Sequence, residues 1–243
     1  MKKALSVTFI LSVVVLSTFA QVRNLSSFDK VSAAEGIEVI LKAGSSETAT
    51  INASSVPEDE VLTEVSGGRL RIHLEGDNHR NVNVKVTVTY KQLSGLGASS
   101  AASIKVQDQV NASGDFDIDA SSAGSVEVSV RAGSVDIDVS SSGKVVANIT
   151  ADELDAELSS AGEIRAEGSV RESDISASSS GGFDGYEFST DDADLRVSSG
   201  ASIKIKVNKS IDARASSGGS IRYGGNPSNT DVSSSSGGSI RKS

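Results

Sequence analysis

An aspartate recurs about every nineteen residues through the second half of the chain. The series comprises Asp117, Asp136, Asp155, Asp174, Asp194, Asp212 and Asp231. Two positions after each of the first three aspartates stands another acid. If the intervening segments stack in register, six acidic side chains gather in one patch. They are Asp117, Asp119, Asp136, Asp138, Asp155 and Glu157. Hard cations such as Ca²⁺ bind several carboxylate oxygens at once. The pattern therefore predicts a candidate calcium site.

The acidic patch has a second interpretation, in which the aspartates are solvated and partly bonded to local backbone amides where turns end. The spacing matches no calcium-binding motif, so both interpretations stay open, and no other cofactor is expected. Serine hydrolase chemistry would need His73 or His79 as its base, because the chain has only 2 His. In "RLRIHLEG", the alternation places His73 on the polar face of a strand. We therefore predict no catalytic residues.

The acidic positions belong to a longer repeat, in which a serine and glycine phrase such as "SSAGSV" ends in an apolar residue. The closing residues are Val126, Val145, Ile164, Phe183, Ile203, Ile221 and Ile240, with Ile104 in the same role. A fixed period of this length is typical of a solenoid. Within each repeat, apolar residues alternate with polar ones, which is the period of a strand. The sequence thus predicts an all-β, single-stranded, right-handed parallel β-helix with coils of about nineteen residues.

The serine and glycine phrases are expected to form the tight corners between strands. The alternative is a functional serine array, flat enough to bind ice or a glycan. Their glycines are expected to adopt backbone angles that a Cβ atom would disfavour. These glycines are Gly124, Gly143, Gly162, Gly181, Gly219 and Gly238. Strand parity predicts that one serine of a pair such as Ser121–Ser122 faces inward. In "GGFDGYEF", Phe183 belongs to the core, and we favour a space-filling role over an exposed contact for Tyr186 and Phe188.

The N-terminal segment, the net charge and the absence of cysteine predict where in the cell the protein is located. Residues 1–20 carry two lysines, an apolar run and small residues before Gln21, which predicts a signal peptide cleaved after Ala20. Cleavage removes two lysines and shifts the net charge from −9 to −11, which disfavours nucleic acid and anionic membranes as partners. The chain has no Cys, so neither disulfides nor a cysteine-linked lipid anchor are expected. No later segment is apolar enough to span a bilayer. The predicted location is periplasmic, outer-membrane surface or secreted, in a bacterium.

The remaining residues are interpreted as one domain in two parts. Residues 21–95 lack the regular period but alternate apolar and polar residues, as in "NVNVKVTVTY". They are expected to form irregular β coils that cap one end of the stack, because exposed end coils would aggregate. Residues 96–243 are expected to form the regular β-helix.

The order of these segments resembles the family of auto-transporter adhesins with a head GIN domain, found in secreted proteins of Bacteroidetes. The resemblance covers essentially all of the chain after residue 20. Its most specific parts are "GIEV" at Gly36–Val39 and "YGGNP" at Tyr223–Pro227. Glu38 stands where the family name has Asn. The resemblance implies a secreted parallel β-helix and an adhesin role, and it transfers no catalytic residue.

The sequence therefore predicts an adhesin-like or structural binding protein that presents a repetitive polar surface. Repetition favours multivalent contact with a repetitive partner, such as an extracellular glycan or a surface protein. The alternative is a glycan-active lyase or hydrolase on the same scaffold. Such enzymes usually carry their sites in long loops, for which coils of near-constant length leave no room. End-to-end association of the rods is a further possibility.

Overall fold

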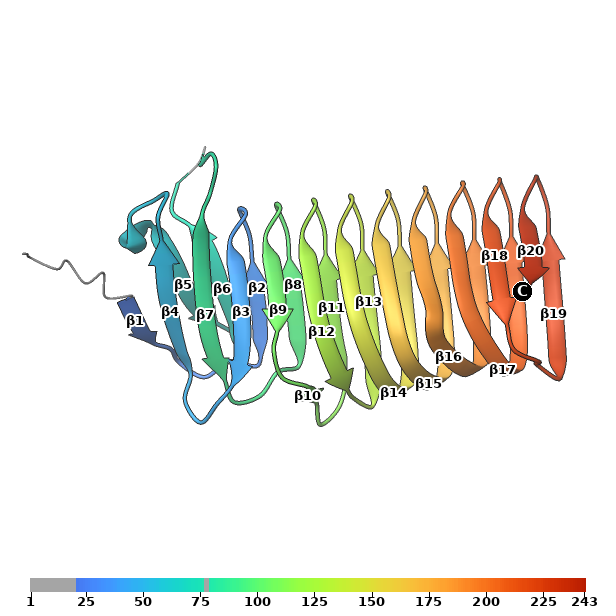
Figure 1. Cartoon of the computed structure of the whole chain (residues 1–243), viewed down its shortest axis with the longest axis horizontal. Helices are drawn as coiled ribbons and strands as arrows, with labels where there is room; N and C mark the ends of the chain where they lie inside the picture. Colours follow the sequence, from blue (N-terminus) through green and yellow to red (C-terminus); the bar gives the residue numbers. More distant parts are fainter. Residues whose placement is uncertain (1–20, 77–78) are drawn as a thin grey trace, which may run out of the picture.

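The structure is a computed structural model that describes residues 21–76 and 79–243. It is an elongated stack of flattened coils, with the N-terminal third at one end and the C-terminus at the other (Figure 1). The predicted signal peptide at residues 1–20 lies outside the described residues. Within the described ranges, no helix has the length and apolar character needed to cross a membrane.

The strands fall into a regular stack and a cap. The stack is built from β2 (Lys30–Ala33), β3 (Glu38–Ala43), β8 (Gly95–Ala98), β9 (Ser103–Val106), β10 (Val110–Asn111), β11 (Phe116–Ala120), β12 (Ser125–Arg131), β13 (Ser134–Val139), β14 (Lys144–Leu158), β15 (Glu163–Ala177), β16 (Gly182–Val197), β17 (Ser202–Ala215), β18 (Ser220–Gly224), β19 (Asn229–Ser234) and β20 (Ser239–Lys242). The cap contains β1 (Gln21–Asn24), β4 (Thr48–Ala53), the 3₁₀ helix Glu58–Glu60, β5 (Val61–Ser66), β6 (Arg69–Leu74) and β7 (Val84–Tyr90).

Each coil pairs with its neighbours in parallel, in the register that the repeat predicts. In the strands before the corner, Ile118 pairs with Ile137, and Ile137 pairs with Ala156. In the strands after the corner, Val126 pairs with both Ile104 and Val145. Because side chains alternate along each strand, the apolar columns of the two sheets meet in one continuous core. The fold is the predicted right-handed parallel β-helix (Figure 1).

Each serine phrase forms a tight turn whose second and third residues have positive φ. In the corner Ser121–Gly124, φ is 49° at Ser122 and 61° at Ala123, and the N–H of Gly124 donates to the carbonyl of Ser121 at 2.8 Å. Two central residues in the left-handed region, closed by this bond, make a type I′ turn. Corners also bond to each other, since the N–H of Ala123 donates to the carbonyl of Ser141 at 3.0 Å.

The predicted reason for the corner glycines is wrong. None of the six glycines has a positive φ. The positive φ values fall on the second and third residues of each corner, such as Ser122 and Ala123. Glycine is needed at the fourth corner position because the backbone of the preceding coil passes next to it. At Gly162, a Cβ atom would stand 2.5 Å from the carbonyl oxygen of Val139. Close approach of two coils, and not backbone angle, therefore excludes a side chain there.

The predicted inward serine is also wrong. At the corner of Ser140 and Ser141, the first serine is half-buried on the outer surface and the second is exposed. The buried corner position is the fourth, at Gly143. The turn interrupts the strand alternation on which the prediction relied.

The first regular corner lies inside the N-terminal third, at residues 34–37. Glu35 and Gly36 have φ of 61° and 71°, and the N–H of Gly36 donates to the carbonyl of Ser100 in the next corner at 2.9 Å. Strands β2 and β3 thus form the first coil and pair with β8 and β9. The intervening segment inserts β4 to β7, which extend both sheets outward.

The inserted strands close the N-terminal end of the stack. Strand β7 pairs in parallel with β3, and β4 then pairs antiparallel with β7 and β1. On the other sheet, β6 pairs in parallel with β2, and β5 pairs antiparallel with β6. The end of the parallel stack is therefore covered by antiparallel strands.

The aromatic residues of β16 divide between core and surface. Phe183 and Phe188 are buried, with ring centroids 6.0 Å apart, and they fill the space beside Gly185. Tyr186 is 69% exposed, so the space-filling prediction is right for Phe188 and wrong for Tyr186.

Candidate functional site: a serine groove beside an acidic hollow

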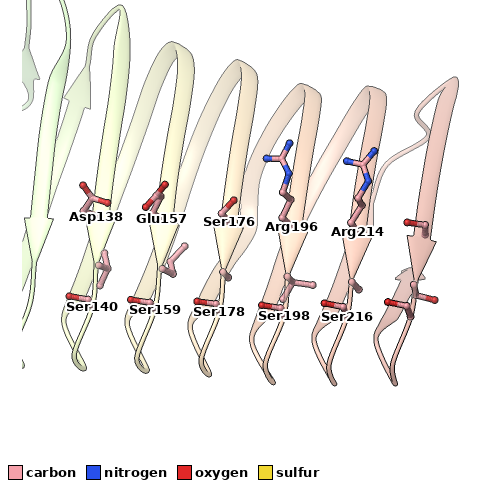
Figure 2. A pocket seen from close by; sticks show the side chains of 18 residues that line it. Asp138, Ser140, Glu157, Ser159, Ser176, Ser178, Arg196, Ser198, Arg214 and Ser216 are labelled. Carbon is pink, nitrogen blue, oxygen red and sulfur yellow. The ribbon is translucent and has the colours of Figure 1, made fainter.

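A groove with a volume of about 870 Å³ follows the stack axis beside the corners. We call it the serine groove. Its corner side is a row of half-buried or exposed serines, one per coil: Ser140, Ser159, Ser178, Ser198, Ser216 and Ser235. Its other side is a second row: Asp138, Glu157, Ser176, Arg196, Arg214 and Ser233. Figure 2 shows the serine side chains in line along successive coils.

The groove follows from strand alternation next to the turn. In β13, Val139 points into the core, so the residues on either side of it, Asp138 and Ser140, point outward. The same three positions recur in each coil in register, so they form parallel rows. Neighbouring strands lie about 4.8 Å apart, which sets the spacing of the hydroxyl groups along the groove. The groove can therefore offer regularly spaced hydrogen-bond donors and acceptors to an extended ligand.

Charge changes sign along the second row, from Asp138 and Glu157 to Arg196 and Arg214 (Figure 2). The arginines form ion pairs with the aspartates that recur once per coil, which we call the aspartate column. Arg196 contacts Asp174 at 3.0 Å and Asp194 at 2.8 Å, and the contact with Asp174 raises the pKa of its guanidinium. Arg214 contacts Asp212 at 3.1 Å. The basic end of the groove is thus largely neutralised by the protein itself.

The acidic end of the groove shares Asp138 and Glu157 with a second hollow of about 470 Å³, which we call the acidic hollow. It is lined by all six predicted acidic residues, Asp117, Asp119, Asp136, Asp138, Asp155 and Glu157, together with Ile118 and Ile137. The structure therefore brings the predicted patch together. Within residues 21–76 and 79–243, however, no three His, Asp or Glu side chains are arranged to hold a metal ion. Calcium binding stays a prediction.

Burial and like charge both act on the carboxyls of the acidic hollow. Partial desolvation, followed by the charge of Asp138, raises the pKa of Asp119. Desolvation and the charges of neighbouring acids likewise raise the pKa values of Asp136 and Asp155. No cation in the described part of the chain forms an ion pair with Asp136, Asp138, Asp155 or Glu157. These groups therefore bear unneutralised repulsion.

A lysine from the first coil ends the aspartate column at its N-terminal side. Lys30 forms an ion pair with Asp117, although Gly95 lies between them in the register. The Lys30 side chain passes over Gly95, whose Cβ would stand 3.4 Å from its methylene groups. Sequence reasoning missed this pair because the two charges are 87 residues apart.

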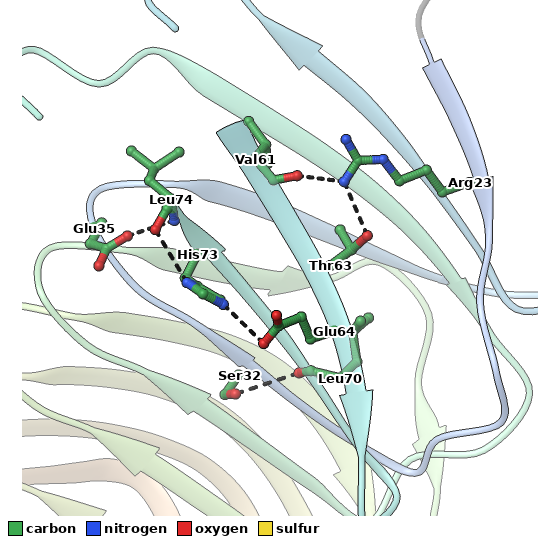
Figure 3. A network of polar contacts seen from close by, with 9 residues as sticks. All are labelled: Arg23, Ser32, Glu35, Val61, Thr63, Glu64, Leu70, His73 and Leu74. Atoms are coloured by element: carbon green, nitrogen blue, oxygen red, sulfur yellow. Dashed lines mark hydrogen bonds and ion pairs between the residues drawn. The ribbon is translucent and has the colours of Figure 1, made fainter. Parts of the chain in front are cut away.

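Both histidines have partners within the cap, and Figure 3 shows those of His73. His73 Nε2 lies 3.3 Å from Glu64 Oε2, and its Nδ1 lies 3.2 Å from the carbonyl oxygen of Leu74. His79 Nε2 lies 2.8 Å from the carbonyl oxygen of Glu75. Among the described residues, neither ring hydrogen-bonds a serine hydroxyl. The glycan-active enzyme stays an untested alternative.

The remaining contacts of Figure 3 tie the cap strands together. Arg23 donates to the carbonyl oxygen of Val61 and, at 3.2 Å, to the hydroxyl of Thr63. Glu35 accepts the backbone N–H of Leu74 at 2.6 Å, which joins the first corner to β6. Ser32 donates to the carbonyl oxygen of Leu70 at 3.4 Å. The contacts of Arg23 join two cap strands, whereas those of Glu35 and Ser32 hold the cap on the first coil.

Several solved structures share this fold. A putative adhesin from Parabacteroides merdae has a TM-score of 0.85 at 17% identity, with 93% of this chain and 95% of that chain covered. A putative adhesin from Parabacteroides distasonis has a TM-score of 0.81 at 18% identity, with 93% and 96% covered. A protein from the same species, described as a putative lipid binding protein, has a TM-score of 0.81 at 22% identity, with 93% and 96% covered. No protein of curated function matches the chain.

The family profile described as "Putative auto-transporter adhesin, head GIN domain" matches residues 27–227. Both motifs that suggested this family mark special backbone positions. Gly36 is the third residue of the first corner, and Ile37 is fully buried after it. Gly225, in "YGGNP", has a φ of 89° and faces the backbone of Val207. The match spans most of the sequence, and the chain belongs to this head GIN domain family.

Proposed function

We propose that this protein is an exported, adhesin-like binding protein that holds an extended extracellular glycan along the serine groove. The observation that carries the proposal is the straight row of outward serines, one per coil. A glycan presents hydroxyl groups along its length, and each can exchange hydrogen bonds with a serine hydroxyl. Individual contacts of this kind are weak, but several on one chain add through effective concentration.

The chemistry of the groove favours a polar ligand of low net charge. Its acidic and basic residues lie at opposite ends, and the arginines are already paired. A rigid parallel stack also presents the rows without the ordering cost that a flexible loop would add on binding. The family description and the solved relatives described as adhesins support a surface role.

A glycan array with the chain after residue 20 tests the proposal. Ser178→Arg places a long side chain in the middle of the groove, and we expect it to reduce binding of the selected glycan at least about tenfold. Ser129→Arg is the matched control, because Ser129 is an exposed serine of β12 outside the groove, and it should bind like the native protein. Equal binding by both variants would reject the groove as the site.

Export is tested separately by cell fractionation. A full-length chain should appear outside the cytoplasm with a mature N-terminus at Gln21, whereas a chain that starts at Gln21 should stay inside the cell. Retention of the full-length chain in the cytoplasm would contradict this part of the proposal.

A further inference from the structure

A β-bulge in β16 turns a tyrosine out of the sheet. In the pairing of β15 with β16, Arg165 matches Asp184 and Glu167 matches Glu187, so Gly185 and Tyr186 together stand opposite Ala166. The additional residue gives this coil its longer spacing, between Phe183 and Ile203. Bulges commonly redirect a side chain at functional positions. Here the bulge leaves Tyr186 69% exposed.

Three cations from the next two coils line a hollow together with this tyrosine. Lys206 of β17 lies 5.8 Å from the centre of the Tyr186 ring. Lys204, also of β17, pairs in register with Arg222 of β18. These residues line a hollow of about 510 Å³ with Ile205, Gly224, Gly225 and Ser243. We call it the tyrosine hollow.

The charges of the tyrosine hollow are poorly balanced by the protein. Asp184 approaches Lys204 only to 3.7 Å, and within the described ranges neither Lys206 nor Arg222 forms an ion pair. In register, Arg222 is followed by Arg241, so like charges occupy adjacent coils. Such repulsion is unfavourable, and it stands out in a chain with a net charge of −9. An anionic ligand would relieve it.

The combination of groups selects a sugar among anionic ligands. An exposed aromatic ring offers an apolar face to the C–H groups of a pyranose, while the adjacent cations offer charge-assisted hydrogen bonds to a carboxylate or sulfate. The volume lies within the range of small-ligand sites, roughly 300–1,000 Å³. A membrane would need a broader apolar surface. Among described residues, the other exposed large hydrophobics are Val22 in β1 and Val232 in β19.

We propose that the tyrosine hollow binds an acidic sugar, with the ring on Tyr186 and its carboxylate or sulfate on Lys206 and Arg222. Lys204 contributes to the same positive field. The hollow is lined by residues that follow a corner in each coil, whereas the serine groove is lined by residues that precede the next corner, so the two lie on different faces of the stack. The site therefore goes beyond the proposed function and does not depend on it.

Isothermal titration with three oligosaccharides tests the proposal. The probes are an oligomer of uronic acid, a sulfated oligosaccharide and a neutral oligosaccharide of similar length. We expect the native protein to bind at least one anionic probe, more weakly at high salt, and to bind the neutral probe at least about tenfold more weakly. The probe that binds identifies the anionic group. Binding of neither anionic probe, or equal binding of all three, would overturn the proposal.

Variants locate the binding. Tyr186→Ala and Arg222→Gln should each weaken binding about tenfold, while Tyr186→Phe keeps the ring and should bind nearly as the native protein does. Arg165→Gln is the matched control, because Arg165 is exposed at the same position of an earlier coil, outside the hollow. A loss with Arg165→Gln as large as with Arg222→Gln would show general charge attraction and reject the site.

Two further measurements distinguish the tyrosine hollow from the serine groove and from a membrane-binding surface. Ser178→Arg should leave binding of the anionic probe unchanged, so failure of the serine groove does not affect this test. Vesicles of anionic phospholipid form the last arm of the experiment. Binding to these vesicles that Tyr186→Ala abolishes, with no binding to either anionic sugar, would assign the hollow to a membrane surface and overturn the proposal.

Discussion

The carbonyl oxygen of Val139 lies 2.5 Å from the point where a Cβ atom on Gly162 would stand. The two residues belong to adjacent coils, and their backbones meet at the exit of the corner. The same position is glycine in six corners, but it is Ala102 and Ala201 in two others and Ile37 in the first corner, so the gap between coils varies along the stack. Close packing at the corner thus sets which coils tolerate a methyl group.

Gly162→Ala should destabilise the protein by about 2 kcal/mol, since overpacking against a fixed backbone costs roughly 1–3 kcal/mol. Thermal unfolding followed by circular dichroism would show a fall in Tm of about 4–8 °C. The control is Gly182→Ala in β16, where a Cβ would have only ordinary contacts, the nearest at 3.9 Å. A similar loss for both variants would show that close approach of the coils is not the cause.

Ala161→Gly should stabilise the protein by about 0.5 kcal/mol. Ala161 has a φ of 61°, and an L-residue in the left-handed region costs roughly 1–2 kcal/mol. Part of the gain is lost because glycine has more freedom in the unfolded chain. The reverse change, Gly218→Ala, introduces a Cβ atom at the same turn position in the last corner but one. It should lower the stability of the protein. Chemical denaturation of the two variants measures both signs, and a loss of stability in Ala161→Gly would contradict the expected strain.

The pKa values of Asp119, Asp136 and Asp155 are raised in the folded protein, chiefly by desolvation and then by like charge. A carboxyl with a raised folded pKa destabilises the fold when it is ionised. This cost is present above the folded pKa and disappears as the pH falls toward the unfolded value near 4. Mild acidification should therefore stabilise the acidic hollow.

Asp136→Asn should raise Tm at pH 7 by about 2 °C at low ionic strength, because it removes repulsion from both neighbouring coils. The gain should shrink at high salt and at pH 4. Asp152→Asn is the control, since Asp152 is exposed outside the hollow. A Tm gain that does not change with pH would show that charge is not its cause.

Calcium should bind the acidic hollow weakly. The six carboxylates share an open hollow but are not grouped as a set of metal ligands, so we expect a rise in Tm only at roughly millimolar Ca²⁺. The double variant Asp136→Asn, Asp138→Asn should abolish that rise. A native Tm that is identical in calcium and in chelator would contradict the predicted site.

Rods should associate weakly through the end formed by β19 and β20. Val232 is 42% exposed, although the residues at the same position of earlier coils are buried. In the described part of the chain, β19 pairs with β17 along one edge, and its other edge has no partner strand. Sedimentation at increasing concentration should show association that Val232→Lys reduces. Concentration-independent monomers would contradict this expectation.

Sequence periodicity predicted the coils well because each inward position repeats in register, from Ile118 to Ala213. It could not locate the first coil, because the corner at Glu35 and Gly36 lacks the serine phrase and its partner strands come after an insertion. It also could not place Tyr186, since a bulge changes which face a side chain occupies.

The candidate site was predicted in part. The acidic hollow follows from the repeat alone. The position of the serine groove was not predicted, because the prediction carried strand alternation through the corner, where the turn interrupts it. The pair of Lys30 and Asp117 depends on the absence of a side chain at Gly95 between them, a relation that only the stacked structure reveals.

The first coil also has a consequence for the order of folding. Asp29 and Ser94, 65 residues apart, hydrogen-bond where the cap joins the stack. Every later coil instead closes against a segment only one repeat away. Closing the long insertion is therefore the slow entropic step. The later coils do not depend on it, so they can pair with one another before the cap joins the stack.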